Sequence, residues 1–171
     1  KKNTLVIAAP STAIPAAKGF AAHKQLIYKQ ILHKAARCGR TFILPLNKDR
    51  IEICKKVFYL TEDITDKDIV IVDDSLVRGN TIKGIISLFK KAKSIHIRIA
   101  SPPVKFPCYY GIDIATKEEL IANNSSVEEI RQEINADSLL YLSLEGMKYS
   151  FGSKQICTGC FNGKYNKDLE W

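Results

Sequence analysis

The stretch Val70-Ile71-Val72-Asp73-Asp74-Ser75-Leu76-Val77-Arg78-Gly79-Asn80-Thr81 decides the fold of this 171-residue chain. An apolar strand ends in two adjacent carboxylates, and a loop of small residues then leads into an amphipathic helix expected over residues 81–92. A third strand, with strictly alternating apolar residues, is expected over residues 94–100. This order of strand, loop, helix and strand favours a right-handed crossover and a parallel sheet. We therefore predict an α/β fold, a twisted and mainly parallel sheet flanked by helices.

The loop in this stretch suits a ligand that carries both a phosphate and a ribose diol. Backbone N–H groups at a helix start bind phosphate, and the helix dipole favours its negative charge. Gly79 tolerates positive φ and allows close approach, while the hydroxyls of Ser75 and Thr81 can donate to phosphate oxygens. Asp73 and Asp74 repel phosphate, so we expect them to face sugar hydroxyls or a divalent cation. Taken alone, two adjacent carboxylates are more typical of a strand that ends in an acidic turn without function, and only the loop as a whole favours a binding site.

The rest of the chain supplies further elements of the same fold. An apolar strand is expected over residues 4–9 and a helix over 15–24, followed by a short strand within 25–32. An irregular basic segment is expected over 33–45, and helices over 47–58, 116–122 and 127–134. Ser126 and Glu129 form a capping signature for the last helix. We predict one domain over residues 1–146 and a polar, aromatic C-terminal segment over 147–171 that packs on it.

Composition restricts the class of protein and its partners. The chain is 46% hydrophobic and 26% charged, as in soluble globular proteins. No apolar run is long enough to span a bilayer, so we expect no membrane partner. The net charge of +8 is consistent with simple solubility or with an anionic ligand. Basic residues are spread along the chain without a recognition motif, so nucleic acid is not the expected partner. Five cysteines without a secretory signal predict a reducing, cytoplasmic location.

The loop resembles the phosphoribosylpyrophosphate signature of type I phosphoribosyltransferases, in the form found in glutamine phosphoribosylpyrophosphate amidotransferases. Further segments resemble that family in the same order: residues 39–43, 101–103, 107–113, 118–122, 127–134 and 137–139. The resemblance implies a type I phosphoribosyltransferase fold that binds phosphoribosylpyrophosphate and Mg²⁺. It also implies that ammonia displaces pyrophosphate to give phosphoribosylamine, the first step of purine synthesis. In the family an N-terminal glutaminase domain, which this sequence lacks, supplies the ammonia. A homo-oligomer is expected.

The resemblance assigns roles to individual residues. Lys34 and Arg40 are the expected catalytic cations, which stabilise the departing pyrophosphate. Mg²⁺ is expected at Thr12, Asp73 and Asp74. Substrate binding is expected at Ser11, Thr12, Arg50, Asp73, Asp74, Ser75, Leu76, Val77, Arg78, Gly79, Asn80 and Thr81.

The sequence departs from the family pattern in two places. Ser11 replaces an acid, and the family's asparagine and tyrosine are missing between Lys34 and Gly39. A non-catalytic module that senses phosphoribosylpyrophosphate therefore remains the alternative function.

A C-x-x-C pair lies near the end of the chain, at Cys157 and Cys160. By itself this spacing is consistent with a redox pair, half of a zinc site or chance. The resemblance implies instead that Cys108, Cys157 and Cys160 bind a structural [4Fe–4S] cluster. In the family the fourth ligand lies before the first strand, so this sequence does not contain it. Cys38 and Cys54 are interpreted as ordinary small residues.

Overall fold

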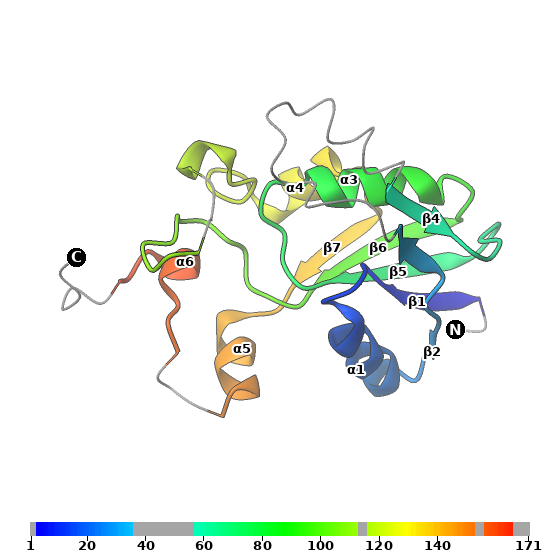
Figure 1. Cartoon of the computed structure of the whole chain (residues 1–171), viewed down its shortest axis with the longest axis horizontal. Helices are drawn as coiled ribbons and strands as arrows, with labels where there is room; N and C mark the ends of the chain where they lie inside the picture. Colours follow the sequence, from blue (N-terminus) through cyan, green and yellow to red (C-terminus); the bar gives the residue numbers. More distant parts are fainter. Residues whose placement is uncertain (1–2, 36–56, 113–115, 153–155, 166–171) are drawn as a thin grey trace.

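The computed structural model describes residues 3–35, 57–112, 116–152 and 156–165. Its centre is a parallel five-stranded sheet in the order β2-β1-β5-β6-β7 (Figure 1). In chain order these strands are β1 (Thr4–Ala8), β2 (Ile27–Tyr28), β5 (Asp68–Asp73), β6 (Ser94–Ile99) and β7 (Ser138–Tyr141). A separate antiparallel pair consists of β3 (Leu32–Lys34) and β4 (Phe58–Leu60). The predicted α/β class with a mainly parallel sheet is confirmed.

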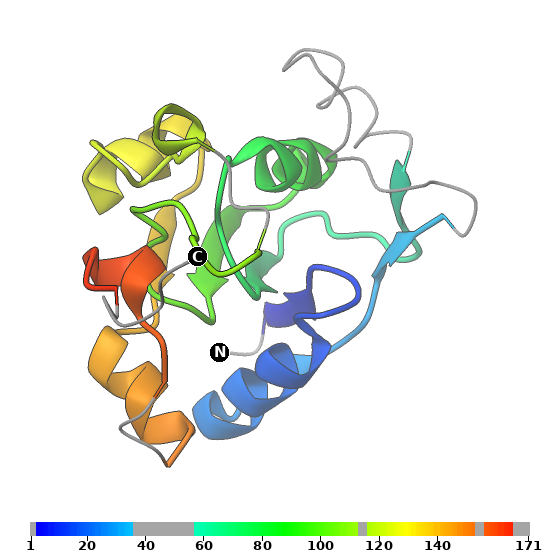
Figure 2. The ribbon, with the colours of Figure 1, turned by 60° about the vertical axis from the view of Figure 1, so that its left-hand side comes forward.

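Helices cover both faces of this sheet. Helix α1 (Ile14–Lys24) packs on one face, whereas α3 (Asn80–Ile86) and α4 (Val127–Glu133) pack on the other (Figure 1). Two single turns of 3₁₀ helix, η2 (Ser87–Phe89) and η3 (Lys117–Glu119), follow α3 and precede α4. Two short helices, α5 (Leu144–Ser150) and α6 (Gly159–Asn162), lie beyond the carboxyl ends of the strands (Figures 1 and 2). Among the described residues, no helix is both long and apolar enough to cross a bilayer.

The strands are continuous apolar runs because each face of the sheet is covered. Residues Val70 and Val72 of β5 are buried on the same sheet face as each other, and Ile69 and Ile71 are buried on the opposite face. Small residues of α1 allow that helix to lie close to the sheet, and isoleucines of α3 fill the other side. The buried residues that do this are Ala17, Ala21, Ile82, Ile85 and Ile86.

Several elements differ from their predicted form. The helix expected over residues 81–92 is α-helical only to Ile86 and ends in η2. The helix expected over 116–122 is the single turn η3, after which Leu120 continues in an extended conformation. Phe58 was expected to end a helix over 47–58 but lies in β4, and Lys34 lies in β3 rather than in irregular chain. The remainder of those two segments, residues 36–56, lies outside the described residues.

The cap of α4 is confirmed in detail. The Glu129 backbone N–H donates to Ser126 Oγ at 3.2 Å, and the Ser126 N–H donates to Glu129 Oε2 at 2.7 Å. Two otherwise unpaired donors at the helix start are satisfied in this way. The division proposed at residue 146 falls within α5 and stays a prediction.

Candidate functional site

The carboxyl end of β5 leads directly into the loop that the sequence singles out, residues 73–79. The Asp74 N–H donates to Asp73 Oδ1, and the Ser75 N–H donates to Asp74 Oδ1, each at 2.9 Å. These bonds order the two carboxylates at the start of the loop. Gly79 caps α3 with φ of 77°, a left-handed conformation that glycine adopts without strain. The positive φ expected of Gly79 is confirmed.

A cavity of about 430 Å³ opens where the ends of β1 and β5 meet. The Ala9 N–H donates to the Val72 carbonyl at 2.8 Å, which aligns the two strand ends. Lys34 and Phe58 reach the same cavity from the β3–β4 pair. The described residues that line the cavity are Ala9, Pro10, Thr12, Lys34, Phe58, Ile82, Ile85 and every residue from Asp73 to Thr81.

Most of the predicted site residues therefore share one cavity, although they come from three separate segments. Thr12 and Lys34 are brought to the loop, as the predicted roles require. Ser11 is exposed and does not line the cavity, and the peptide bond before it is cis. Arg40 and Arg50 lie outside the described residues, so their predicted roles stay predictions.

At the cavity, burial and the adjacent carboxylate make the ionised form of Asp73 unfavourable. Burial and the neighbouring charge of Asp74 raise the pKa of Asp73 to about 8. A carboxyl group with that pKa is mainly protonated at neutral pH until a cation or a set of donors approaches it. Two adjacent carboxylates of this kind, at an open strand end, fit a divalent cation that shares its ligands with a phosphorylated substrate.

The inner side of the loop serves packing rather than binding. Leu76 lies in the main core, and Val77 packs against the buried pair Val104 and Leu120. Because the Leu76 side chain is buried, we expect any contact of Leu76 with a ligand to come from its backbone. Gly79 is constrained by the same packing, since a Cβ there would lie 2.6 Å from Ile121 Cδ1. Sequence reasoning anticipated the backbone role of this glycine but not the close contact.

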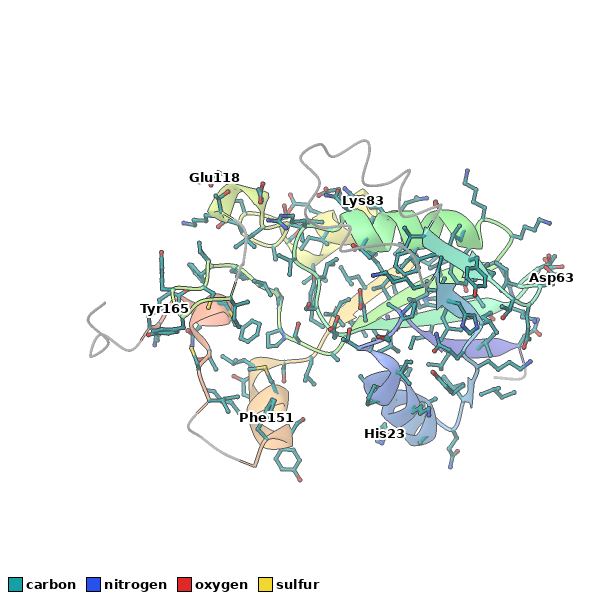
Figure 3. All side chains as sticks on the ribbon, viewed as in Figure 1. His23, Asp63, Lys83, Glu118, Phe151 and Tyr165 are labelled. Carbon is teal, nitrogen blue, oxygen red and sulfur yellow. The ribbon has the colours of Figure 1, made fainter. Side chains whose placement is uncertain are left out.

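Two ion pairs that the sequence did not reveal connect the loop and α3 to later segments. Arg78 donates through Nε to Glu119 Oε2 at 2.9 Å, and its Nη2 lies 2.8 Å from the same oxygen. Lys83 Nζ lies 2.7 Å from Glu133 Oε1, which joins α3 to α4. Figure 3 labels Lys83 of α3 and Glu118 of η3. Pairs this far apart in sequence leave no local pattern to read.

These ion pairs border a second cavity of about 730 Å³ on the other side of the loop. Arg78 and Asn80 line both cavities. The remaining lining of the second cavity consists of Lys83, Lys117, Glu118, Glu119, Leu120, Ile121, Asn123, Asn124, Ser125 and Glu133. Four of its six acidic and basic side chains form ion pairs, whereas no ion pair of Asp73 or Asp74 is found among the described residues.

The three described cysteines gather near α6. Cys108 and Cys160 are half-buried, Cys157 is exposed, and all three are free thiols. Burial and the nearby Cys108 and Cys157 raise the pKa of the Cys160 thiol. As they stand, the described residues contain no group of three or more histidine, cysteine or acidic side chains placed to hold a metal ion. The thiols are thus neighbours without forming a complete metal site.

Backbone and aromatic contacts join the two cysteine-bearing segments. The N–H groups of Lys105 and Phe106 both donate to the Cys160 carbonyl, at 2.9 and 3.0 Å. The Tyr165 ring lies 4.8 Å from the Tyr109 ring in an edge-to-face arrangement, and its hydroxyl donates to the Pro107 carbonyl (Figure 3). Segments about fifty residues apart in sequence are therefore packed together beside the loop.

Comparison with known sequences gives consistent relatives, although no protein-family model matches the chain. The chain is 40% identical to the amidophosphoribosyltransferase of Homo sapiens, over 98% of the chain and 38% of that protein. It is 43% identical to the amidophosphoribosyltransferase of Methanothermobacter thermautotrophicus, over 96% of the chain and 36% of that protein. The enzyme of the same name from Pyrococcus horikoshii is 46% identical over 94% of the chain.

Solved structures agree with these relatives. A glutamine phosphoribosylpyrophosphate amidotransferase from B. subtilis, complexed with ADP and GMP, superimposes with a TM-score of 0.80 and 39% identity over 98% of the chain. A structure described as the allosteric regulatory enzyme of purine biosynthesis also gives 0.80, with 40% identity over 95% of the chain. The chain spans 40% and 37% of those two proteins, respectively. The chain thus belongs to the amidophosphoribosyltransferase family, of whose members it spans well under half the length.

Proposed function

We propose that this chain is the phosphoribosyltransferase half of an amidophosphoribosyltransferase. The observation that carries the proposal is the 430 Å³ cavity, which combines an acidic strand end, a loop that opens a helix, and Lys34. A ligand with a ribose diol and phosphate groups matches this combination of donors and acceptors. Family membership supports the same substrate, phosphoribosylpyrophosphate.

In this proposal, each part of the cavity binds one part of the substrate. Backbone N–H groups between Ser75 and Thr81 bind the 5-phosphate, with the hydroxyls of those two residues as further donors. Asp73 and Asp74 accept hydrogen bonds from the ribose hydroxyls. Thr12 and Lys34 bind the pyrophosphate, together with the predicted partners Ser11, Arg40 and Arg50.

The reaction is a displacement at C1 of the ribose. The ammonia nitrogen forms a bond to C1 with its lone pair, and the C1–O bond to pyrophosphate breaks with inversion. Pyrophosphate leaves with the bonding electrons, and the new ammonium group loses one proton to give phosphoribosylamine. Negative charge grows on the leaving oxygen during this step, so a cation such as Lys34 lowers the barrier by meeting it there. Ammonia is already a nucleophile, and no histidine is needed as a base.

We also propose Mg²⁺ as a cofactor, bound by Asp73 and Asp74 with Thr12 nearby. The raised pKa of Asp73, caused by burial and by Asp74, supports a site that a cation would relieve. When bound, Mg²⁺ neutralises phosphate charge and orients the substrate. Because Mg²⁺ takes much of its coordination from water and substrate oxygens, two carboxylates are a sufficient protein contribution.

A [4Fe–4S] cluster at Cys108, Cys157 and Cys160 is proposed from the family resemblance. The mutual proximity of the three thiols supports it. Three cysteines are one fewer than the usual ligand set, so the proposed cluster requires a fourth ligand, which the family resemblance places before the first strand. The role proposed for the cluster is structural, with no part in the displacement.

The remaining partners are proposals as well. We propose that a glutaminase domain supplies the ammonia and that the protein works as a homo-oligomer. A cytoplasmic location is proposed because the described cysteines are free thiols, as a reducing compartment favours.

The proposal is tested by ammonia-dependent release of pyrophosphate from phosphoribosylpyrophosphate in the presence of Mg²⁺. We expect Asp74→Asn to lower the rate by about 100-fold or more, because a carboxylate is lost at the reacting sugar. Asp66→Asn, an exposed acid remote from the cavity, is the matched control and should be unaffected. Pyrophosphate release that does not depend on ammonia would contradict the proposed transferase activity. Tight binding without any release would favour the non-catalytic sensing module instead.

A further inference from the structure

We call residues 73–79 the phosphate loop. Three contacts connect this loop to a later segment of the chain. The Arg78 guanidinium binds Glu119, the Ile121 N–H donates to the Val77 carbonyl at 2.9 Å, and the Ile121 side chain packs beneath Gly79. All three come from residues 117–122, which we name the supporting segment. This segment lies about forty residues beyond the loop in the sequence, and Glu119 does not line the 430 Å³ cavity.

The supporting segment is itself fixed to the molecule. Its Leu120 is buried against Val104, with Phe161 and Cys160 of α6 packed on the same cluster. The turn is closed by the Glu119 N–H, which donates to the Thr116 carbonyl at 3.0 Å. Glu119 therefore lies on an anchored turn, which makes its carboxylate a fixed reference point for Arg78.

Arg78 occupies a position where its orientation matters. It lines both cavities, and its side chain is 24% exposed. A free guanidinium there has many rotamers, and the loop backbone could follow its motion. Paired with Glu119, the side chain is held against the supporting segment, and the loop N–H groups then remain in one arrangement before any phosphate arrives. Binding energy is then not spent on ordering the loop.

We propose that Glu119 is a positioning residue for the phosphate loop, acting through Arg78 rather than on the ligand. This inference rests on the proposed function, since it assumes that the loop binds phosphoribosylpyrophosphate. The inference predicts that removing the charge of Glu119 weakens binding of the anionic substrate, which is opposite to the effect expected from electrostatic repulsion alone. Removing a negative charge near an anion site should otherwise strengthen anion binding.

The test compares two neighbouring glutamates on the same turn. Titration calorimetry of Mg²⁺ and phosphoribosylpyrophosphate into the full chain should give roughly three- to tenfold weaker binding for Glu119→Gln, because a loosely held loop misplaces its donors. Glu118→Gln removes the same charge beside Arg78's partner and should bind as tightly as wild type, or slightly more tightly. The melting temperatures of both variants should match wild type, because a partly exposed ion pair contributes little to stability.

A double-mutant cycle separates positioning from a general structural effect. If Glu119 acts through Arg78, adding Glu119→Gln to Arg78→Gln should cause no further loss of affinity. Additive losses, or equal binding by the Glu119→Gln and Glu118→Gln variants, would overturn the inference while leaving the proposed function intact. Failure of the wild-type chain itself to bind would instead count against the proposed function.

Discussion

The phosphate loop and the cysteine segment lie side by side but are stabilised in different ways. The loop, residues 73–79, is held by buried side chains, a backbone hydrogen bond and an ion pair, all present without a ligand. The cysteine segment, residues 105–110 with 157–165, is joined by aromatic contacts and by two hydrogen bonds to one carbonyl. Burial and the neighbouring thiols of Cys108 and Cys157 raise the pKa of Cys160, so this group of side chains does not stabilise the segment by itself.

This difference indicates which region is organised in advance. A loop that must recognise phosphate through backbone N–H groups gains affinity when those groups are already fixed. A structural cluster site can be completed by its ligand, because the ligand then contributes directly to folding. The shared Val104 and Leu120 cluster connects the two regions, so order in the cysteine segment supports the loop.

The glycine at the end of the phosphate loop and the glycine that follows Tyr110 of the cysteine segment give the sharpest contrast. A Cβ on Gly79, whose φ is 77°, would lie 2.6 Å from Ile121 Cδ1, whereas a Cβ on Gly111, whose φ is 84°, would meet no atom of the described residues within 4 Å. We expect Gly79→Ala to lower the free energy of unfolding by about 2–4 kcal/mol and Gly111→Ala by only about 1 kcal/mol, since overpacking adds to the strain of a left-handed residue. Urea denaturation measures both values. Equal losses would mean that packing under the loop is not rigid.

The acidic end of the loop should make stability depend on pH. The folded-state pKa of Asp73 is raised to about 8, so the folded protein binds a proton that the unfolded chain has released. The free energy of unfolding should therefore fall as pH rises from about 4 to about 9 in metal-free buffer.

Asp73→Asn replaces the carboxyl group by an amide that does not ionise, so the variant should lose this part of the pH dependence. At about pH 9 the variant should be more stable than wild type by at least about 2 kcal/mol, and near pH 4 the two should agree. Thermal unfolding across this range provides the measurement. If the stability of the variant changed with pH in the same way as that of wild type, a group other than Asp73 would be responsible for the pH dependence.

The cysteine segment should show graded thiol reactivity. The pKa of Cys160 is raised by burial and by its two neighbours, and Cys157 is exposed. Iodoacetamide should therefore label Cys157 at least about tenfold faster than Cys160 near neutral pH, because only the thiolate reacts. Mass spectrometry of the digested protein gives the ratio, with Cys108 as an internal reference. Faster labelling of Cys160 would contradict this account of the segment.

The smallest effect is expected at the ion pair between α3 and α4. Glu133→Gln removes the partner of Lys83, whose side chain is 24% exposed, while Glu133 itself is 48% exposed. Solvent screens such a pair, so we expect a loss of about 0.5 kcal/mol. Calorimetric unfolding with Glu118→Gln as control would detect it. A loss several times larger would show that α4 is held mainly by this contact.

The sequence predicted the features that local patterns encode. A short continuous apolar run with polar residues at both ends, such as Ile69–Val72, favours a buried strand, and a capping box such as Ser126 with Glu129 has a fixed spacing. The place of the phosphate loop followed from the same reasoning, because ligands bind where parallel strands end.

Other features depend on residues that are far apart. The pairing of Arg78 with Glu119 and the contact of Gly79 with Ile121 arise only after folding. Phe58 was predicted in a helix because a short apolar segment fits either periodicity, and its pairing opposite Lys34 decides for a strand. The turn after Thr116 is short because the chain becomes extended at Leu120, and the apolar side chains of Leu120 and Ile121 are buried.

The most direct test of the central claim is calorimetric titration of phosphoribosylpyrophosphate into the wild-type chain, with and without Mg²⁺. Our account predicts saturable binding that requires Mg²⁺ and is lost when Asp73→Asn and Asp74→Asn are combined, but is retained in Asp66→Asn. Binding that is indifferent to Mg²⁺ and to the acidic pair would contradict the assignment of this cavity.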